Sequence, residues 1–186
     1  MKNKVWLIVA CVFAAVMVLA AVLYPKLSEK YSIDSTSDNK ISDAVIQADD
    51  FTVYDSQMNE VKLSDCFGKP IVINFWASWC GPCKSELPAF NSLYEKYKDD
   101  VVFLMINLTD GQSDTESSIK QFVSDNGYSF PVYYDLEYDA SNTYGVRSIP
   151  ETIFIHADGS LYDTRVGAMR ENILENYIKQ LIGGER

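Results

Sequence analysis

The segment from residue 71 to residue 97 constrains the fold more than any other part of the chain. Residues 71–76 are an almost unbroken run of β-branched and aromatic residues, the composition of a strand that is buried on both faces. From residue 81 to residue 97, apolar side chains recur at intervals of three and four, which predicts a helix with one buried face. A buried strand that leads directly into an amphipathic helix indicates an α/β domain.

After residue 50, the chain continues to alternate between patterns typical of strands and patterns typical of helices. Further strands are predicted at residues 51–54, 61–63, 101–107, 131–134, 152–156 and 161–166. Further helices are predicted at residues 115–125, 136–144 and 170–182. This order of strands and helices implies a mixed sheet with helices on both faces, within one domain at residues 49–186.

A separate hydrophobic segment lies near the N-terminus, where residues 5–24 are all apolar or aromatic. At about 1.5 Å per residue, a helix of this length spans roughly 30 Å, the thickness of a bilayer's hydrocarbon core. Lys2 and Lys4 precede it, which favours a cytoplasmic N-terminus at residues 1–4 and a single-pass anchor in the cell membrane. The serine-rich, aperiodic residues 25–48 predict a flexible stalk, so the domain is expected to be extracytoplasmic.

Two kinds of cleaved signal are the alternatives to this transmembrane anchor. A secretory signal has a shorter apolar region, of about 7–15 residues, followed by a small-residue cleavage site that is missing after residue 20. A lipoprotein signal would end at Cys11, which only six apolar residues precede. Both observations favour the uncleaved anchor.

The charge of the chain excludes one class of partner. The net charge is -10, and residues 31–186 alone carry 12 basic and 25 acidic side chains. Because binding to phosphate requires a basic surface, we expect no nucleic-acid partner.

Cys80 and Cys83 lie on either side of a Gly-Pro dipeptide, where the buried strand meets the helix. The unpaired N–H groups at a helix N-terminus stabilise an anion, so the pKa of the Cys80 thiol should lie below that of a free thiol. Cys80 is therefore the candidate nucleophile, and Cys83, one turn further along the helix, can resolve the mixed disulfide that Cys80 forms with a substrate.

A zinc site and a permanent structural disulfide are the alternatives for this cysteine pair. Zinc needs two further ligands, whereas the chain has no second CxxC and a single histidine, His156. A disulfide that closes so short a loop yields little entropic stabilisation. We therefore expect redox chemistry without a metal or another cofactor.

The sequence of residues 74–84, NFWASWCGPCK, resembles the active-site segment of the thioredoxin superfamily. Residues 68–70, 85–88, 148–152 and 158–159 are similar to those of the membrane-tethered TlpA/ResA/CcmG-type thiol-disulfide oxidoreductases. The resemblance covers residues 50–182. It implies a thioredoxin-like three-layer α/β/α sandwich with a mixed central sheet.

The resemblance also implies roles for residues beside the cysteines. Pro150 matches the family's cis-proline, and Ile149 before it would face the cysteines and pair with a bound substrate strand; the alternative is a trans proline that starts a strand. Trp79 would flank the reactive sulfur or pack in the core. Glu86 would tune the pKa values of the cysteines or move protons, unless it is a solvated helix residue.

The implied function is a membrane-tethered extracytoplasmic oxidoreductase that reduces disulfides in exported client proteins, apocytochrome c among them. Its electrons would come from a CcdA-like or DsbD-like membrane donor. One alternative is a thioredoxin-fold peroxidase, although Ala77 stands where those enzymes carry a threonine. Another is a tethered binding protein or chaperone whose cysteines are incidental. Cys66 matches no motif of the family.

Overall fold

The computed structural model describes residues 16–21, 23, 24 and 45–183, which belong to two units, residues 1–44 and residues 45–186. In the first unit the described residues are helical. Over the described ranges of both units, no helix has the length and apolar character needed to cross a membrane. Most of the predicted anchor at 5–24, and the predicted stalk as far as residue 44, lie outside the described residues.

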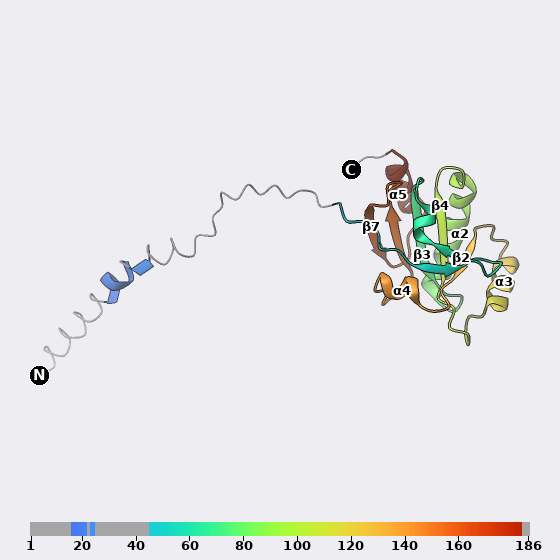
Figure 1. The fold of residues 1–186 in the computed structure, drawn as a ribbon, viewed down its shortest axis with the longest axis horizontal. Helices are drawn as coiled ribbons and strands as arrows, with labels where there is room; N and C mark the ends of the chain where they lie inside the picture. The colour runs from blue at the N-terminus through green and yellow to red at the C-terminus, as the bar shows by residue number, and fades with distance from the viewer. Residues whose placement is uncertain (1–15, 22, 25–44, 184–186) are drawn as a thin grey trace, which may run out of the picture. The chain divides into compact units, whose positions relative to one another are not determined.

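The second unit is built on a seven-stranded mixed sheet with the order β2-β1-β5-β4-β3-β6-β7 (Figure 1). β4 is the central strand, and β3 lies next to it, parallel to β4 and antiparallel to β6. The hairpin β1–β2 and the strand β7 form the two edges, and both pair antiparallel with their neighbours. The strands are β1 (Thr52–Tyr54), β2 (Glu60–Lys62), β3 (Ile71–Trp76), β4 (Val102–Asn107), β5 (Val132–Tyr134), β6 (Glu151–Ile155) and β7 (Leu161–Val166).

The α-helices of the second unit follow the predicted order along the chain, and one 3-10 helix was not predicted. The helices are the 3-10 helix η1 (Leu63–Cys66) and the α-helices α2 (Gly81–Tyr97), α3 (Glu116–Asp125), α4 (Asp139–Thr143) and α5 (Glu171–Gly183). The predicted mixed sheet and thioredoxin-like α/β fold are thus confirmed. The unit also includes residues before the predicted start at residue 49, because Gln47 forms a β-bridge with Ser160.

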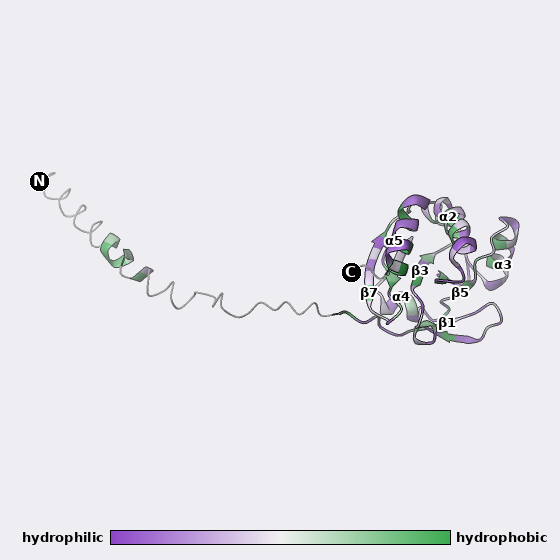
Figure 2. Cartoon of the chain, turned by 90° about the horizontal axis from the view of Figure 1, so that it is seen from above, coloured by the Kyte–Doolittle hydropathy of each residue, from purple (hydrophilic) through white to green (hydrophobic). Residues whose placement is uncertain are grey.

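Successive side chains of β3 point to opposite faces of the sheet, so they contribute to two hydrophobic clusters, one on each face. Val72 and Trp76 contribute to the cluster that also contains buried residues of α2, α3 and α5. Ile73 and Phe75 contribute to the cluster that contains residues of η1 and α4. Figure 2 shows hydrophobic residues along β3, whereas α2, α3 and α5 carry both hydrophobic and hydrophilic residues. Helices on both faces of a strand explain why β3 is apolar at almost every position.

The helix α4 is shorter than the predicted helix at residues 136–144. Tyr138, which precedes α4, has a φ of 56°, a left-handed conformation that interrupts a helix. The carboxylate of Asp135 accepts hydrogen bonds from the N–H groups of Ala140 at 3.1 Å and Ser141 at 2.9 Å. These bonds satisfy donors of the first helical turn, so the helix begins only at Asp139.

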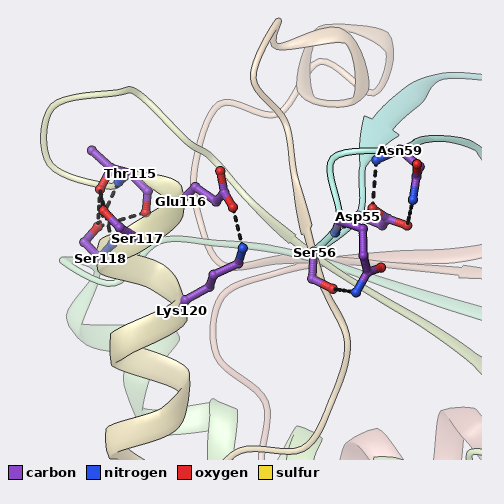
Figure 3. Close-up of polar contacts among 9 residues, drawn as sticks. Asp55, Ser56, Asn59, Thr115, Glu116, Ser117, Ser118 and Lys120 are labelled. Atoms are coloured by element: carbon purple, nitrogen blue, oxygen red, sulfur yellow. Dashed lines mark hydrogen bonds and ion pairs between the residues drawn. The ribbon is translucent and has the colours of Figure 1, made fainter.

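Local polar contacts fix the start of α3 and the turn between β1 and β2 (Figure 3). At α3, the Thr115 side chain accepts from Ser118 N at 3.2 Å and the Ser118 hydroxyl accepts from Thr115 N at 2.8 Å, which is a reciprocal capping box. In the turn, the Asp55 carboxylate accepts from the backbone and the side chain of Asn59, at 2.8 and 3.0 Å. Both the start of α3 and the turn after β1 therefore lie where a short polar side chain can satisfy the backbone.

Candidate active site

The two cysteines lie at the junction of β3 and α2, on the side of the sheet covered by α2. They form a disulfide with an S–S distance of 2.06 Å. Cys80 is the N-cap of α2, and its sulfur accepts a hydrogen bond from Cys83 N at 3.2 Å. Pro82 occupies the first turn, where its missing N–H removes no helical hydrogen bond. The sulfur of Cys80 is thus close to the N–H groups that can stabilise its thiolate once the disulfide is reduced.

The two cysteines differ slightly in exposure. Cys80 is 5% exposed, whereas Cys83 has no exposed surface. A substrate disulfide can therefore reach Cys80 but not Cys83. This asymmetry suits Cys80 for attack on a substrate and Cys83 for the subsequent internal step.

The peptide bond between Ile149 and Pro150 is cis, and it lies directly opposite the cysteines. The carbonyl oxygen of Ile149 is 3.7 Å from the sulfur of Cys80. Gly167 N donates a hydrogen bond of 2.8 Å to the Pro150 carbonyl, which ties the end of β7 to the same loop. The structure thus brings together Cys80 and Ile149, which are 69 positions apart in the sequence.

The two tryptophans before the cysteines have opposite environments. Trp79 is 57% exposed beside Cys80, whereas Trp76 has no exposed surface and packs against Phe122 and Phe130. Trp79 is therefore available to a docking protein, and Trp76 is a core residue.

Glu86, one turn after Cys83 in α2, is a buried carboxylate with 1% of its surface exposed. Its two oxygens accept hydrogen bonds from Asn74 Nδ2 and Met169 N, both at 2.8 Å. Burial raises the pKa of Glu86 to about 7, against the lowering effect of these two bonds. The alternative of a solvated helix residue is therefore wrong, and the site holds a carboxyl group that titrates near neutral pH.

Asn74 connects this carboxyl group to the central strands. Its Nδ2 also donates to Thr152 Oγ1 at 3.1 Å, while its Oδ1 is buried without a hydrogen-bond partner. If the amide rotates, Oδ1 can accept a hydrogen bond from the protonated carboxyl group of Glu86. The structure thus provides partners for both protonation states of Glu86.

Sequence reasoning missed the contact between Glu86 and Met169. The two residues are 83 positions apart, and the contact is a backbone N–H that any residue type at position 169 other than proline would supply. No motif marks such a donor. Only the docking of the loop after β7 against α2 reveals it.

Two further residues considered from the sequence lie away from the disulfide. Cys66 ends η1 as a free, half-buried thiol whose pKa is raised, mainly by burial. His156 follows β6 and packs its ring edge-on against Tyr162 at 5.0 Å. Neither residue joins the arrangement around Cys80.

Comparison with known proteins agrees with this geometry. The model of the AhpC/TSA family matches residues 46–164. The chain is 35% identical over 135 residues to the thiol-disulfide oxidoreductase ResA of Bacillus thuringiensis, covering 73% of this chain and 76% of that protein. It is 33% identical over 171 residues to ResA of Oceanobacillus iheyensis, covering 89% and 84% respectively.

Solved structures show the same relationship. A putative thiol:disulfide interchange protein DsbE from Chlorobium tepidum superposes with a TM-score of 0.66 at 30% identity, covering 74% of this chain and 96% of that one. StoA from Bacillus subtilis superposes with a TM-score of 0.62 at 25% identity, covering 70% and 97%. The chain therefore belongs to the AhpC/TSA family, within which it is a thiol-disulfide oxidoreductase of the ResA type.

Proposed function

We propose that this oxidoreductase works outside the cytoplasm as a membrane-tethered reductase of protein disulfides. The observation that carries the proposal is the position of Cys80, which caps the N-terminus of α2 and is 5% exposed, with the fully buried Cys83 one turn behind it. The Gly-Pro dipeptide between the cysteines is also that of reducing thioredoxins.

The proposed reaction begins with the dithiol form of the protein. The Cys80 thiolate attacks one sulfur of a client disulfide, which forms a mixed disulfide and releases the other client sulfur as a thiolate. Cys83 loses its proton and attacks Cys80, which releases the second client thiolate and leaves the Cys80–Cys83 disulfide. Two electrons pass to the client, and Glu86, with a pKa of about 7, is suited to exchange the proton.

A client strand would bind across Cys80 between Ile149 and Trp79. The Ile149 carbonyl lies 3.7 Å from the Cys80 sulfur, and the exposed Trp79 ring, adjacent to Cys80 in the chain, offers an apolar contact. The exported clients would include apocytochrome c. A dithiol protein of the CcdA or DsbD type in the membrane would then reduce the Cys80–Cys83 disulfide for the next cycle.

Substitution of the two cysteines tests the chemistry. The full chain, purified in detergent and supplied with dithiothreitol, should reduce insulin disulfides. Cys80→Ser should abolish this activity, because the attacking sulfur is lost. Cys83→Ser, pre-reduced and freed of dithiothreitol, should instead form a lasting mixed disulfide between Cys80 and insulin, visible on a non-reducing gel. Full activity of the Cys80→Ser protein would contradict the proposed mechanism.

Three measurements address the client, the direction and the competing functions. In intact membranes, Cys83→Ser should trap client proteins on Cys80, whereas a binding protein with incidental cysteines would capture none. The reduction potential of the Cys80–Cys83 pair should be low enough to reduce client disulfides in its compartment. Hydrogen peroxide should oxidise the dithiol form more slowly than insulin does, and the reverse order would favour a peroxidase.

A further inference from the structure

Asp114 is a carboxylate with no exposed surface in the loop between β4 and α3, and its side-chain partners lie toward the active site. Its Oδ2 accepts hydrogen bonds from Ser78 N and Asn107 Nδ2, both at 2.8 Å. Its Oδ1 accepts a further hydrogen bond from the Ser78 hydroxyl. Because a buried carboxylate is costly unless several donors surround it, this arrangement indicates a specific role.

Ser78 belongs to the short loop at residues 77–79 that leads from β3 to Cys80. Within this loop, Cys80 N donates to the Ala77 carbonyl at 3.2 Å, and Trp79 is the residue between Ser78 and Cys80. Asp114 binds both the backbone and the side chain of Ser78. It therefore restrains the backbone immediately before the exposed indole of Trp79 and the reactive sulfur.

Asp114 is itself held firmly by its own loop. Its N–H donates to Asp110 Oδ1 at 2.9 Å, and its carbonyl accepts from Gly111 N at 3.0 Å. The next residue, Thr115, forms the capping box that starts α3 (Figure 3). The backbone of Asp114 is thus well restrained, and its carboxylate in turn restrains the loop at residues 77–79.

We propose that Asp114 is a positioning residue for thiol-disulfide exchange with protein substrates, and that it acts by holding Ser78 so that Trp79 and Cys80 present one docking surface. Asp114 touches neither sulfur. A small disulfide needs only access to the Cys80 sulfur, whereas a client protein must also fit the surface around it. Loss of Asp114 should therefore slow the reaction with protein disulfides more than the reaction with small ones.

Two substitutions of Asp114 separate hydrogen bonding from charge. Asp114→Ala removes all three bonds. Asp114→Asn can keep them, because its Oδ1 accepts from Ser78 N and Asn107 while its Nδ2 donates to the Ser78 hydroxyl, which can also accept. The matched control is Asp99→Ala, at an exposed position after α2.

The measurement compares two second-order rate constants of the pre-reduced full chain, one with insulin and one with a small aromatic disulfide. For Asp114→Ala we expect the insulin rate to fall by about tenfold or more and the small-disulfide rate to stay within about twofold, because misplacement of binding groups is costly only where they are used. Asp114→Asn should retain the insulin rate within about threefold, and Asp99→Ala should match the unaltered protein.

Three results would overturn the proposal. The first is a folded Asp114→Ala protein with an unchanged insulin rate, the second is an equal loss for both substrates, and the third is an Asp114→Asn protein as defective as Asp114→Ala. If circular dichroism shows that Asp114→Ala does not fold, Ser78→Ala decides, because it removes only the hydroxyl bond. Ser78→Ala should lower the rate constant with insulin by about threefold and leave the rate constant with the small disulfide unchanged. If both rate constants changed by the same factor relative to the unaltered protein, the role of Asp114 would be rejected.

Discussion

At the scale of single residues, the site depends on side chains whose environment changes their chemistry. Cys80 caps a helix, Cys83 is buried, and Glu86 is a carboxyl group enclosed between α2, β3 and the loop after β7. Burial is the main cause of the raised pKa of Glu86. The same residue types on an exposed helix would titrate at their ordinary values.

The raised pKa of Glu86 predicts how stability depends on pH. The folded protein binds this proton more tightly than the unfolded chain, so the contribution to stability is complete below the unfolded value of 4.5 and is lost as pH rises to about 7. Such a pKa shift lowers the free energy of unfolding by about 3 kcal/mol between these two pH limits. Glu86→Gln should lose this pH dependence, because an amide does not titrate. The amide can still accept from Met169 N and, after rotation of Asn74, donate to Asn74 Oδ1.

Urea unfolding of the oxidised full chain at about pH 5 and about pH 8 measures this effect. The free energy of unfolding should fall between the two pH values by more in the unaltered protein than in Glu86→Gln. The matched control is Glu60→Gln, at an exposed position in the edge strand β2. Equal pH dependence in the unaltered protein and Glu86→Gln would show that Glu86 does not titrate in this range.

At the scale of elements, α2 combines the chemistry and the packing of the domain. Its first turn holds the cysteines, Glu86 follows within the helix, and Leu87, Phe90 and Leu93 pack into the core. Pro88 lies inside the helix at an exposed position, and the ring leaves the Lys84 carbonyl without its helical N–H partner. The reactive end of α2 is thus held in place by its own buried face.

The helix α3 offers a test of local stabilisation. Thr115→Ala removes the hydroxyl that accepts Ser118 N, so the free energy of unfolding should fall by about 1 kcal/mol. Ser124→Ala, at an exposed position in the last turn of α3, removes no N-terminal cap and should leave stability unchanged or slightly higher. Urea unfolding of both variants measures the difference. A Thr115→Ala protein as stable as Ser124→Ala would show that the capping box contributes nothing.

At the scale of the whole molecule, the chain separates an apolar N-terminal segment from an acidic catalytic domain. Residues 5–24 are entirely apolar or aromatic, whereas residues 31–186 carry 25 acidic and 12 basic side chains. The domain carries the cysteine chemistry, and we propose that the apolar segment anchors it to a membrane.

Cell fractionation tests the proposed membrane anchor. The full chain should sediment with membranes and stay there after a wash at high pH, because twenty apolar residues partition strongly into the bilayer. A chain that lacks residues 1–44 should be soluble and should keep the insulin activity. Protease added to intact cells should digest the domain. Release of the full chain by the wash, or protection of the domain from protease, would contradict the proposed topology.

The sequence by itself determined the order of the strands and α-helices and identified the reactive pair. The apolar run at residues 71–76 and the spacing at residues 81–97 match β3 and α2 in both bounds, because local periodicity directly reflects which faces are buried. The helix predicted at residues 136–144 was too long, because the left-handed backbone conformation of Tyr138 prevents the helix from starting before Asp139. The cysteines stood out because their chemistry depends on a motif of adjacent residues.

Only the tertiary structure decided the environment of the site. The contacts of Glu86 with Met169, of Cys80 with Ile149 and of Asp114 with Ser78 join residues that are 83, 69 and 36 positions apart. Each of these three contacts uses a backbone N–H or carbonyl group, which almost every residue type supplies, so no pattern of side chains indicates them. Burial and partners, which set a pKa and hold a loop, arise only when the sheet and its helices pack together.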